Sequence, residues 1–152
     1  MASASPSLKG RALRLLARRE HSRAELERKL QPHEDEPGAL ARALDELEAR
    51  GFIDEGRVVQ SVLHQRAARL GAARLRQELQ AKGIAAEAVA DAVAGLQGSE
   101  LERAAALWQR RFGAPPVDAG ERARQMRFLL ARGFSADTAA RVLRSSAGRA
   151  AP

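Results

Sequence analysis

The sequence predicts an all-α protein built from three tandem groups of three helices. Its composition favours helices, because 33 of the 152 residues are Ala and 19 are Leu, against 4 Phe, 1 Trp and no Tyr. Such side chains suit closely packed helices and are too poor in aromatic and β-branched types for a sandwich or barrel. Apolar residues also recur at helical spacing through most of the chain, and similar apolar stripes return after about fifty residues.

The first repeat is predicted over residues 9–53. A helix over 10–19 is followed by a second helix that begins at Ser22, because Ser22-Arg-Ala-Glu25 has the pattern of a capping box. Pro37 is predicted as the first residue of the third helix, which ends at Gly51. The expected buried stripes of this repeat are Leu13, Leu16, Leu26, Leu30, Leu40, Leu44 and Leu47.

The second repeat is predicted over residues 54–98. Its first helix covers 54–70 and its second covers 72–82, with Gly71 and Gly83 as the breaks. The third helix follows after Gly83. The expected buried residues are Val59, Val62, Leu63, Leu70, Leu75, Leu79, Val89, Val93 and Leu96.

The third repeat is predicted over residues 99–144. Ser99-Glu-Leu-Glu102 is a second capping-box pattern, and Trp108 follows on the apolar face of that helix with Leu101, Ala105 and Phe112. A second helix over 121–132 ends at Gly133, and Ser135 caps the last. The Ser-, Ala- and Pro-rich ends, residues 1–8 and 145–152, are expected to be disordered.

Two observations indicate true repeats. The stripe of Leu26 and Leu30 returns 49 residues later as Leu75 and Leu79. The tetrapeptides at 49–52, 81–84 and 131–134 share an Ala-basic-Gly-apolar helix stop, although the first ends a third helix and the others end second helices. The period predicts modules that contact mainly their neighbours, and a single irregular bundle is the alternative.

The positive charge is concentrated in particular segments. The net charge is +7, and 23 of the 26 basic residues are Arg. Segments 9–29, 57–83 and 103–132 each carry +5, whereas 34–55 carries −6 and 84–102 carries −4. This distribution indicates an anionic partner, either nucleic acid or an acidic protein surface. Ordinary solvated helix faces remain the alternative for each single Arg.

No catalytic constellation is present in the sequence, so we predict a protein that is not an enzyme and has no cofactor or metal. There is no Cys, no phosphate-binding glycine motif, and the three His residues are far apart. Asp54-Glu55 is interpreted as the first turn of a helix and His33 to Glu36 as an acidic loop. The lack of Cys, of an apolar span and of an export signal favours a cytoplasmic protein without membrane contact.

Four segments together resemble the RecX family of regulatory proteins, which modulate the recombinase RecA. Each matches one family motif, and they follow one another in the family's order. They are Ala12 to Leu26 (ALRLLARREHSRAEL), Gly51 to Glu55 (GFIDE), Arg69 to Ile84 (RLGAARLRQELQAKGI) and Phe128 to Ser135 (FLLARGFS).

The resemblance implies a curved, elongated array of three three-helix repeats. It also implies a non-catalytic regulator that lies in the groove of the RecA filament on single-stranded DNA and inhibits ATP hydrolysis and strand exchange. We expect a monomer that docks through a basic face. The residues predicted for this face are Arg69, Arg74, Arg76, Lys82, Arg110, Arg111, Arg124, Arg127 and Arg132.

A general DNA-binding helical module that acts without RecA is the alternative. Three-helix units with Arg-rich second helices superficially resemble helix-turn-helix domains. Sequence-specific reading would need Asn, Gln or Ser beside the Arg residues, and the second helices offer mainly Gln77 and Gln125. This shortage argues against a repressor.

Overall fold

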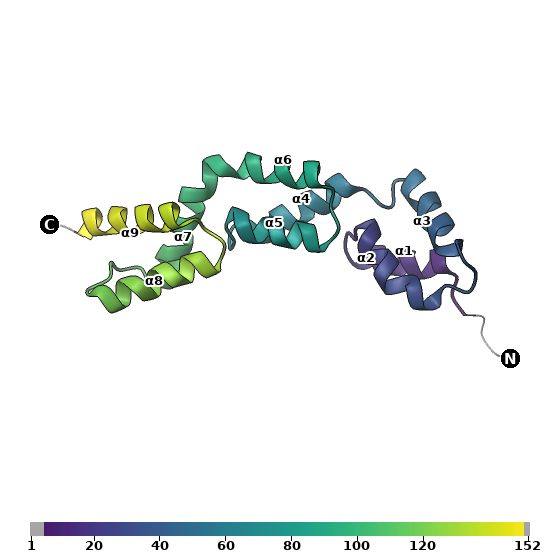
Figure 1. Cartoon of the computed structure of the whole chain (residues 1–152), viewed down its shortest axis with the longest axis horizontal. Helices are drawn as coiled ribbons and strands as arrows, with labels where there is room; N and C mark the ends of the chain where they lie inside the picture. Colours follow the sequence, from purple (N-terminus) through teal and green to yellow (C-terminus); the bar gives the residue numbers. More distant parts are fainter. Residues whose placement is uncertain (1–4, 151–152) are drawn as a thin grey trace.

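The computed structural model describes residues 5–150, and within them it contains nine α-helices, two short 3₁₀ turns and no strand. The helices form three modules that follow one another in a row and give the molecule an elongated, curved shape (Figure 1). Module 1 holds α1 to α3, module 2 holds α4 to α6, and module 3 holds α7 to α9. The predicted all-α fold of three tandem three-helix repeats is therefore confirmed.

Module 1 contains the predicted capping box. The hydroxyl of Ser22 accepts a hydrogen bond from the Glu25 amide, and the Glu25 carboxylate accepts one from the Ser22 amide. The third helix begins two residues after Pro37, because Gly38 adopts a φ of +86° and forms its N-cap instead. The elements are α1 (Leu8–Arg18), α2 (Arg23–Leu30), η1 (Gln31–His33) and α3 (Ala39–Ala49).

Module 2 begins where Asp54 caps its first helix by accepting a hydrogen bond from the Arg57 amide. That helix ends at Arg66 rather than at the predicted residue 70. The chain turns there so that Leu70, which is 3 % exposed, enters the core of the module. The elements are α4 (Glu55–Arg66), α5 (Ala72–Ala81) and α6 (Ala86–Leu96).

Module 3 corrects two expectations. Ser99 forms no capping box, because its hydroxyl donates to the Leu96 carbonyl and accepts from Arg103 Nε. The last helix continues through Ala150, beyond the predicted boundary at residue 144, and the buried Ser146 hydroxyl donates to the Leu143 carbonyl within it. The elements are η2 (Gln97–Ser99), α7 (Glu100–Arg111), α8 (Ala119–Ala131) and α9 (Ala136–Ala150).

Each module has a hydrophobic core of its own. Leu26 and Leu44 lie in the core of module 1, and Leu75 and Leu79 lie in that of module 2. Trp108 is buried in module 3, as its spacing predicted, and its indole N–H donates to Gln125 Oε1 at 2.8 Å. Separate cores are typical of tandem arrays in which each unit packs mainly on its neighbours. The single-bundle alternative is therefore wrong.

The junction between modules 2 and 3 joins the start of α5 to the end of α8. The Gly71 amide donates to the Arg132 carbonyl at 2.7 Å, and the Ala73 amide donates to the Gly133 carbonyl at 3.2 Å. Glu100 accepts from the intervening Ala72 amide at 3.1 Å. Backbone donors at the start of one helix are thus satisfied by carbonyls at the end of another and by a carboxylate of α7.

Arg103 on α7 strengthens this junction from inside. Its Nη1 donates to the carbonyls of Ala67 and Leu70 at 2.7 and 2.6 Å, where the chain leaves α4. Burial lowers the pKa of this guanidinium. Arg103 therefore joins the two modules and lies outside any free basic surface.

The junction between modules 1 and 2 has the same plan, because the start of α2 lies on the end of α5. The Ser22 hydroxyl donates to the Lys82 carbonyl, and Arg28 donates to the Ala81 carbonyl at 3.1 Å. Glu25 is 7 % exposed and forms ion pairs with Arg19 at 2.8 Å and with Lys82 at 3.4 Å. Among the described residues, no hydrogen bond joins backbone groups of modules 1 and 2 directly, so this junction depends on side chains, whereas the other junction has two such backbone bonds.

The close backbone approach at the second junction predicts that Gly71→Ala destabilises the protein. A Cβ at Gly71 would lie 2.4 Å from backbone atoms of Gly133 and Phe134, so the two helix ends must separate. We expect the free energy of unfolding to fall by about 1–3 kcal/mol, the usual cost of overpacking. Chemical denaturation followed by circular dichroism measures this change.

Gly95→Ala is the matched control, because a Cβ at this position on α6 meets no atom within 4 Å. Alanine also favours the helix by about 1 kcal/mol over glycine. We therefore expect a stability equal to that of the natural protein or higher. Equal stabilities for the two variants would contradict the close-approach argument.

The buried charges of module 1 predict a dependence of stability on pH. Burial opposes ionisation of Glu25, but hydrogen bonds from Arg19 and the Ser22 amide, together with the charge of Lys82, lower its pKa to about 2. The unfolded chain takes up this proton at a higher pH than the folded one, so Glu25 stabilises the fold above pH 5 and ceases to do so as the pH falls toward 2.

We expect Glu25→Gln to be about 1.5–3 kcal/mol less stable than the natural protein at pH 7, as for other hydrogen bonds to charged groups. Its stability should also change less between pH 5 and 3. Urea denaturation at both pH values measures the difference, with the exposed Glu87→Gln as control. Parallel pH profiles for the natural protein and Glu25→Gln would refute this role.

Candidate binding surface

The nine residues predicted for the basic face divide into two groups in the structure. Three of them donate hydrogen bonds or ion pairs at the module junctions. Arg74 Nη1 donates to the Ala131 carbonyl at 3.0 Å, and Arg110 Nη2 donates to the Ala68 carbonyl at 3.4 Å. Lys82 forms the ion pair with Glu25. These side chains are therefore already engaged within the molecule.

The other six have neither a hydrogen bond nor an ion pair from their guanidinium groups in the part of the chain that the structure describes. Only one of them, Arg132, is half-buried, and the rest are exposed. We call this set the open arginines. They are Arg69, Arg76, Arg111, Arg124, Arg127 and Arg132.

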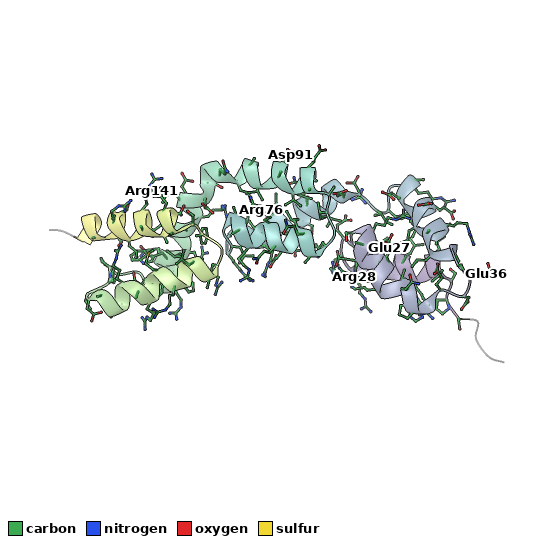
Figure 2. All side chains as sticks on the ribbon, viewed as in Figure 1. Glu27, Arg28, Glu36, Arg76, Asp91 and Arg141 are labelled. Carbon is green, nitrogen blue, oxygen red and sulfur yellow. The ribbon has the colours of Figure 1, made fainter. Side chains whose placement is uncertain are left out.

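On α5, Arg74 and Arg76 point to different sides of the helix. Two residues correspond to about 200° of rotation, and the buried stripe of Leu75 and Leu79 lies between them. One flank therefore turns to module 3 and the other to solvent. Arg76 is labelled on α5 in Figure 2. A basic run in the sequence thus supplies one junction residue and one open arginine.

On α8, basic and aromatic side chains form a continuous stripe. Arg124, Phe128 and Arg132 are four residues apart, a spacing that places them on one side of a helix. The end of α7 adds Arg111 and Phe112, whose ring meets that of Phe128 edge to face at a centroid distance of 5.3 Å. The sequence analysis did not assign Phe112 and Phe128 to a binding surface. The four-residue spacing of Arg124, Phe128 and Arg132 could have indicated that Phe128 lies beside the two arginines.

The pairing of charges differs along the molecule. In module 1, Arg23 alone contacts three carboxylates, those of Glu27, Asp45 and Glu48, at 2.7–3.1 Å. In module 2, Arg66 forms two hydrogen bonds with Glu78, at 2.8 and 3.2 Å. No arginine side chain of module 3 that the structure describes lies within 4.0 Å of a carboxylate oxygen. The uncompensated positive charge is therefore greatest in module 3.

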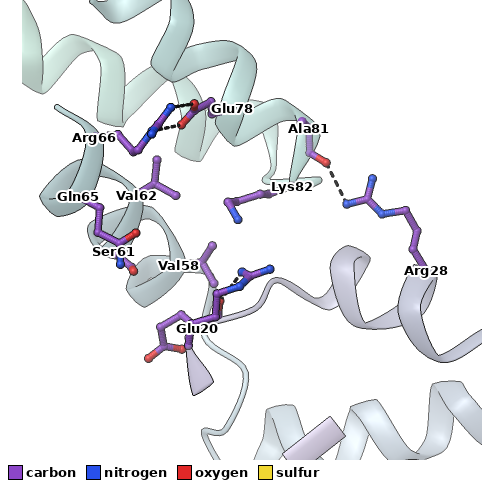
Figure 3. Close-up of a pocket in the computed structure, with 11 residues that line it drawn as sticks. Glu20, Arg28, Val58, Ser61, Val62, Gln65, Arg66, Glu78, Ala81 and Lys82 are labelled. Carbon is purple, nitrogen blue, oxygen red and sulfur yellow. Dashed lines mark hydrogen bonds and ion pairs between the residues drawn. The ribbon is translucent and has the colours of Figure 1, made fainter. Parts of the chain in front are cut away.

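A cleft of about 540 Å³ lies between modules 1 and 2 (Figure 3). Its charged side chains differ from the open arginines in having partners. Its charged walls are already paired. Arg66 binds Glu78, Arg28 binds the Ala81 carbonyl, and Arg19 and Lys82 bind Glu25. Val58 and Val62 contribute its apolar lining. A charged ligand would have to break these pairs in order to bind.

Neither a metal centre nor a membrane segment is found among residues 5–150. No three His, Asp or Glu side chains in this range are grouped as metal ligands would be. Every helix in the range is too short or too polar to cross a bilayer.

Comparison with known proteins matches all three modules. Models of the first, second and third three-helix domains of RecX match residues 9–47, 54–93 and 99–143. The regulatory protein RecX of Leptothrix cholodnii is 59 % identical over 146 residues, covering 95 % of this chain and 93 % of that protein. That of Ralstonia nicotianae is 49 % identical and covers 92 % and 88 %.

Solved structures show the same fold. The crystal structure of RecX from Lactobacillus salivarius aligns with a TM-score of 0.76 at 19 % identity, over 92 % of this chain and 94 % of that one. A second crystal structure of a regulatory protein RecX aligns with a TM-score of 0.73 at 20 % identity, over 89 % and 70 %.

The fold and its surface thus define an all-α tandem-repeat protein with separate cores and with open arginines on its second and third modules. The family models cover most of the chain, and the relatives match over nearly their full length. The chain belongs to the RecX family of regulatory proteins.

The two flanks of α5 predict different outcomes for charge reversal. Arg74→Glu removes the hydrogen bond to Ala131 and places a carboxylate beside backbone carbonyls, so we expect the free energy of unfolding to fall by about 1–3 kcal/mol. Arg76→Glu changes an exposed side chain that has no partner among the described residues, and we expect a change within about 0.5 kcal/mol. Urea denaturation compares them, and equal losses would show that the flanks do not differ.

Proposed function

We propose that this protein binds the RecA filament on single-stranded DNA and inhibits its ATP hydrolysis and strand exchange without catalysing a reaction itself. Membership of the RecX family is the observation that carries the proposal, since it supports a regulator of RecA. The open arginines support an anionic partner, because their guanidinium groups are not compensated within the described chain. The protein acts as a monomer in the cytoplasm.

The shape of the array fits a filament better than a compact partner. In the row of three modules, the open arginines lie on modules 2 and 3, whose helices α5 and α8 follow one another along the molecule (Figure 1). Each exposed contact contributes little in water, but several contacts that form together add to one binding energy. An elongated partner with repeated negative charge meets this requirement.

A general DNA-binding module that acts without RecA is the second candidate, and one observation bears on it. Of the polar residues suited to base reading, Gln125 is buried and accepts the Trp108 indole N–H. On the second helices, Gln77 and Gln80 remain exposed, and both lie on α5. Two such residues on one helix offer little direct base recognition, so this alternative amounts to binding without sequence specificity.

The test measures the rate at which the cognate RecA hydrolyses ATP in the presence of single-stranded DNA while this protein is added in increasing amounts. A reaction without DNA serves as the blank. We expect hydrolysis to fall at fewer copies of the protein than of RecA. Arg76→Glu should need about ten-fold more protein for half inhibition, which corresponds to about 1.4 kcal/mol of binding energy.

Arg14→Glu is the matched control, because Arg14 is an exposed arginine of module 1 outside the predicted face. It changes the net charge by the same amount and should inhibit like the natural protein. Full-length protein that leaves hydrolysis unchanged, yet binds bare DNA in a salt-sensitive manner, would favour the general DNA-binding module.

A further inference from the structure

Five side chains on module 3 form a layered group that we call the arginine–phenylalanine cluster. Its members are Arg111, Phe112, Arg124, Phe128 and Arg132. The guanidinium carbon of Arg132 lies 4.9 Å from the centre of the Phe128 ring, and that of Arg111 lies 5.2 Å and 5.8 Å from the Phe112 and Phe128 rings. Arg124 lies 5.7 Å from the Phe112 ring. Three guanidinium groups thus cover two rings.

These guanidinium groups are held by the rings alone. Within the described residues, none of the three makes a hydrogen bond or lies within 4.0 Å of a carboxylate, although each carries five N–H donors. Arg111 and Arg124 are exposed and Arg132 is half-buried. Cation–π contact therefore places three planar cations at the surface while it leaves their N–H edges free.

We propose that the arginine–phenylalanine cluster binds unpaired nucleotides of single-stranded DNA. A base stacks on the outer side of a guanidinium whose inner side lies over a phenyl ring, and the free N–H edges donate to the neighbouring phosphate. Stacking on aromatic or guanidinium planes is how single strands are bound without sequence preference. The choice of single-stranded DNA as the ligand rests on the proposed function, and the cluster names the residues that would contact this DNA.

The planar chemistry distinguishes this ligand from other anions. A duplex presents phosphates, but its bases are stacked inside and have no free face for the cluster. An acidic protein surface needs positive charge and the paired donors of arginine but no base to stack on it. Replacement of arginine by lysine retains the charge and removes both the stacking plane and the paired donors, and a strand without bases separates these two losses.

The experiment is fluorescence anisotropy of the full chain, without RecA, with a labelled oligothymidylate of about 20 nucleotides and an abasic strand of the same length. We expect the double variant Arg111→Lys, Arg124→Lys to bind the oligothymidylate at least about five-fold more weakly than the natural protein, the lower end for loss of one base stack. Its affinity for the abasic strand should fall by a clearly smaller factor, because that strand offers phosphates but no bases and the charge is retained.

The matched control is Arg141→Lys, Arg144→Lys on α9. Both residues are exposed arginines of the same module without a described partner, and neither lies over a ring. Arg141 lies on the side of α9 away from α8 (Figure 2). This variant should bind both strands like the natural protein. Phe128→Leu keeps an apolar side chain and removes one supporting ring, so it should weaken oligothymidylate binding while helix content is retained.

Two results would overturn the proposal. The lysine variant could bind the oligothymidylate as the natural protein does, or the natural protein could bind the abasic strand equally well. In the first case, a loss of affinity for RecA free of DNA would show that the cluster is a protein-binding surface. None of these results depends on ATP hydrolysis by RecA, so failure of the cluster is distinguishable from failure of the proposed function.

Discussion

The array depends on one contact made twice, in which the start of one helix lies on the glycine turn that ends another. Helix starts have amide donors without intrahelical partners, and helix ends have carbonyls in the same condition. At both junctions these groups, or the side chains beside them, satisfy one another. The approach is so close that a Cβ at Gly83 would lie 2.5 Å from Ala24 Cβ, and one at Gly133 would lie 2.5 Å from the Arg74 amide nitrogen. Three small cores are thereby joined into one elongated molecule.

The two junctions use the same geometry with different chemistry. Between modules 2 and 3, two hydrogen bonds join backbone groups directly, and charged side chains add five more, from Glu100, Arg103, Arg74 and Arg110. Between modules 1 and 2 they involve Ser22, Glu25 and Lys82, and the neighbouring cleft is lined by further charged groups. Charged side chains thus join the modules at both junctions. In module 3, three further arginines lie at the surface, where they rest on rings.

Local patterns predicted much of this fold and less of the surface. The capping box at Ser22 formed as its pattern predicted. The same pattern at Ser99 failed because the Ser99 hydroxyl donates to the Leu96 carbonyl and accepts from Arg103 Nε. Trp108 was placed correctly by its spacing.

The roles of individual arginines could not be read in this way. Arg74 and Arg76 are equivalent in a charge count, and only the packing of module 3 against one flank of α5 separates them. The meeting of Phe112 with Phe128 across two helices depends in the same way on tertiary structure.

The repeated junction also gives the molecule a direction. The end of α8 meets the start of α5, and the end of α5 meets the start of α2, so the three second helices follow one another with the same polarity from module 3 to module 1 (Figure 1). This direction is opposite to the order of the modules in the chain. The two ends of the array also differ in chemistry, because the arginine–phenylalanine cluster lies on module 3, whereas the ion-pair network of Arg23 lies on module 1. A polar filament would consequently distinguish the two orientations of the bound array, and only one would bring module 3 to the more negative surface.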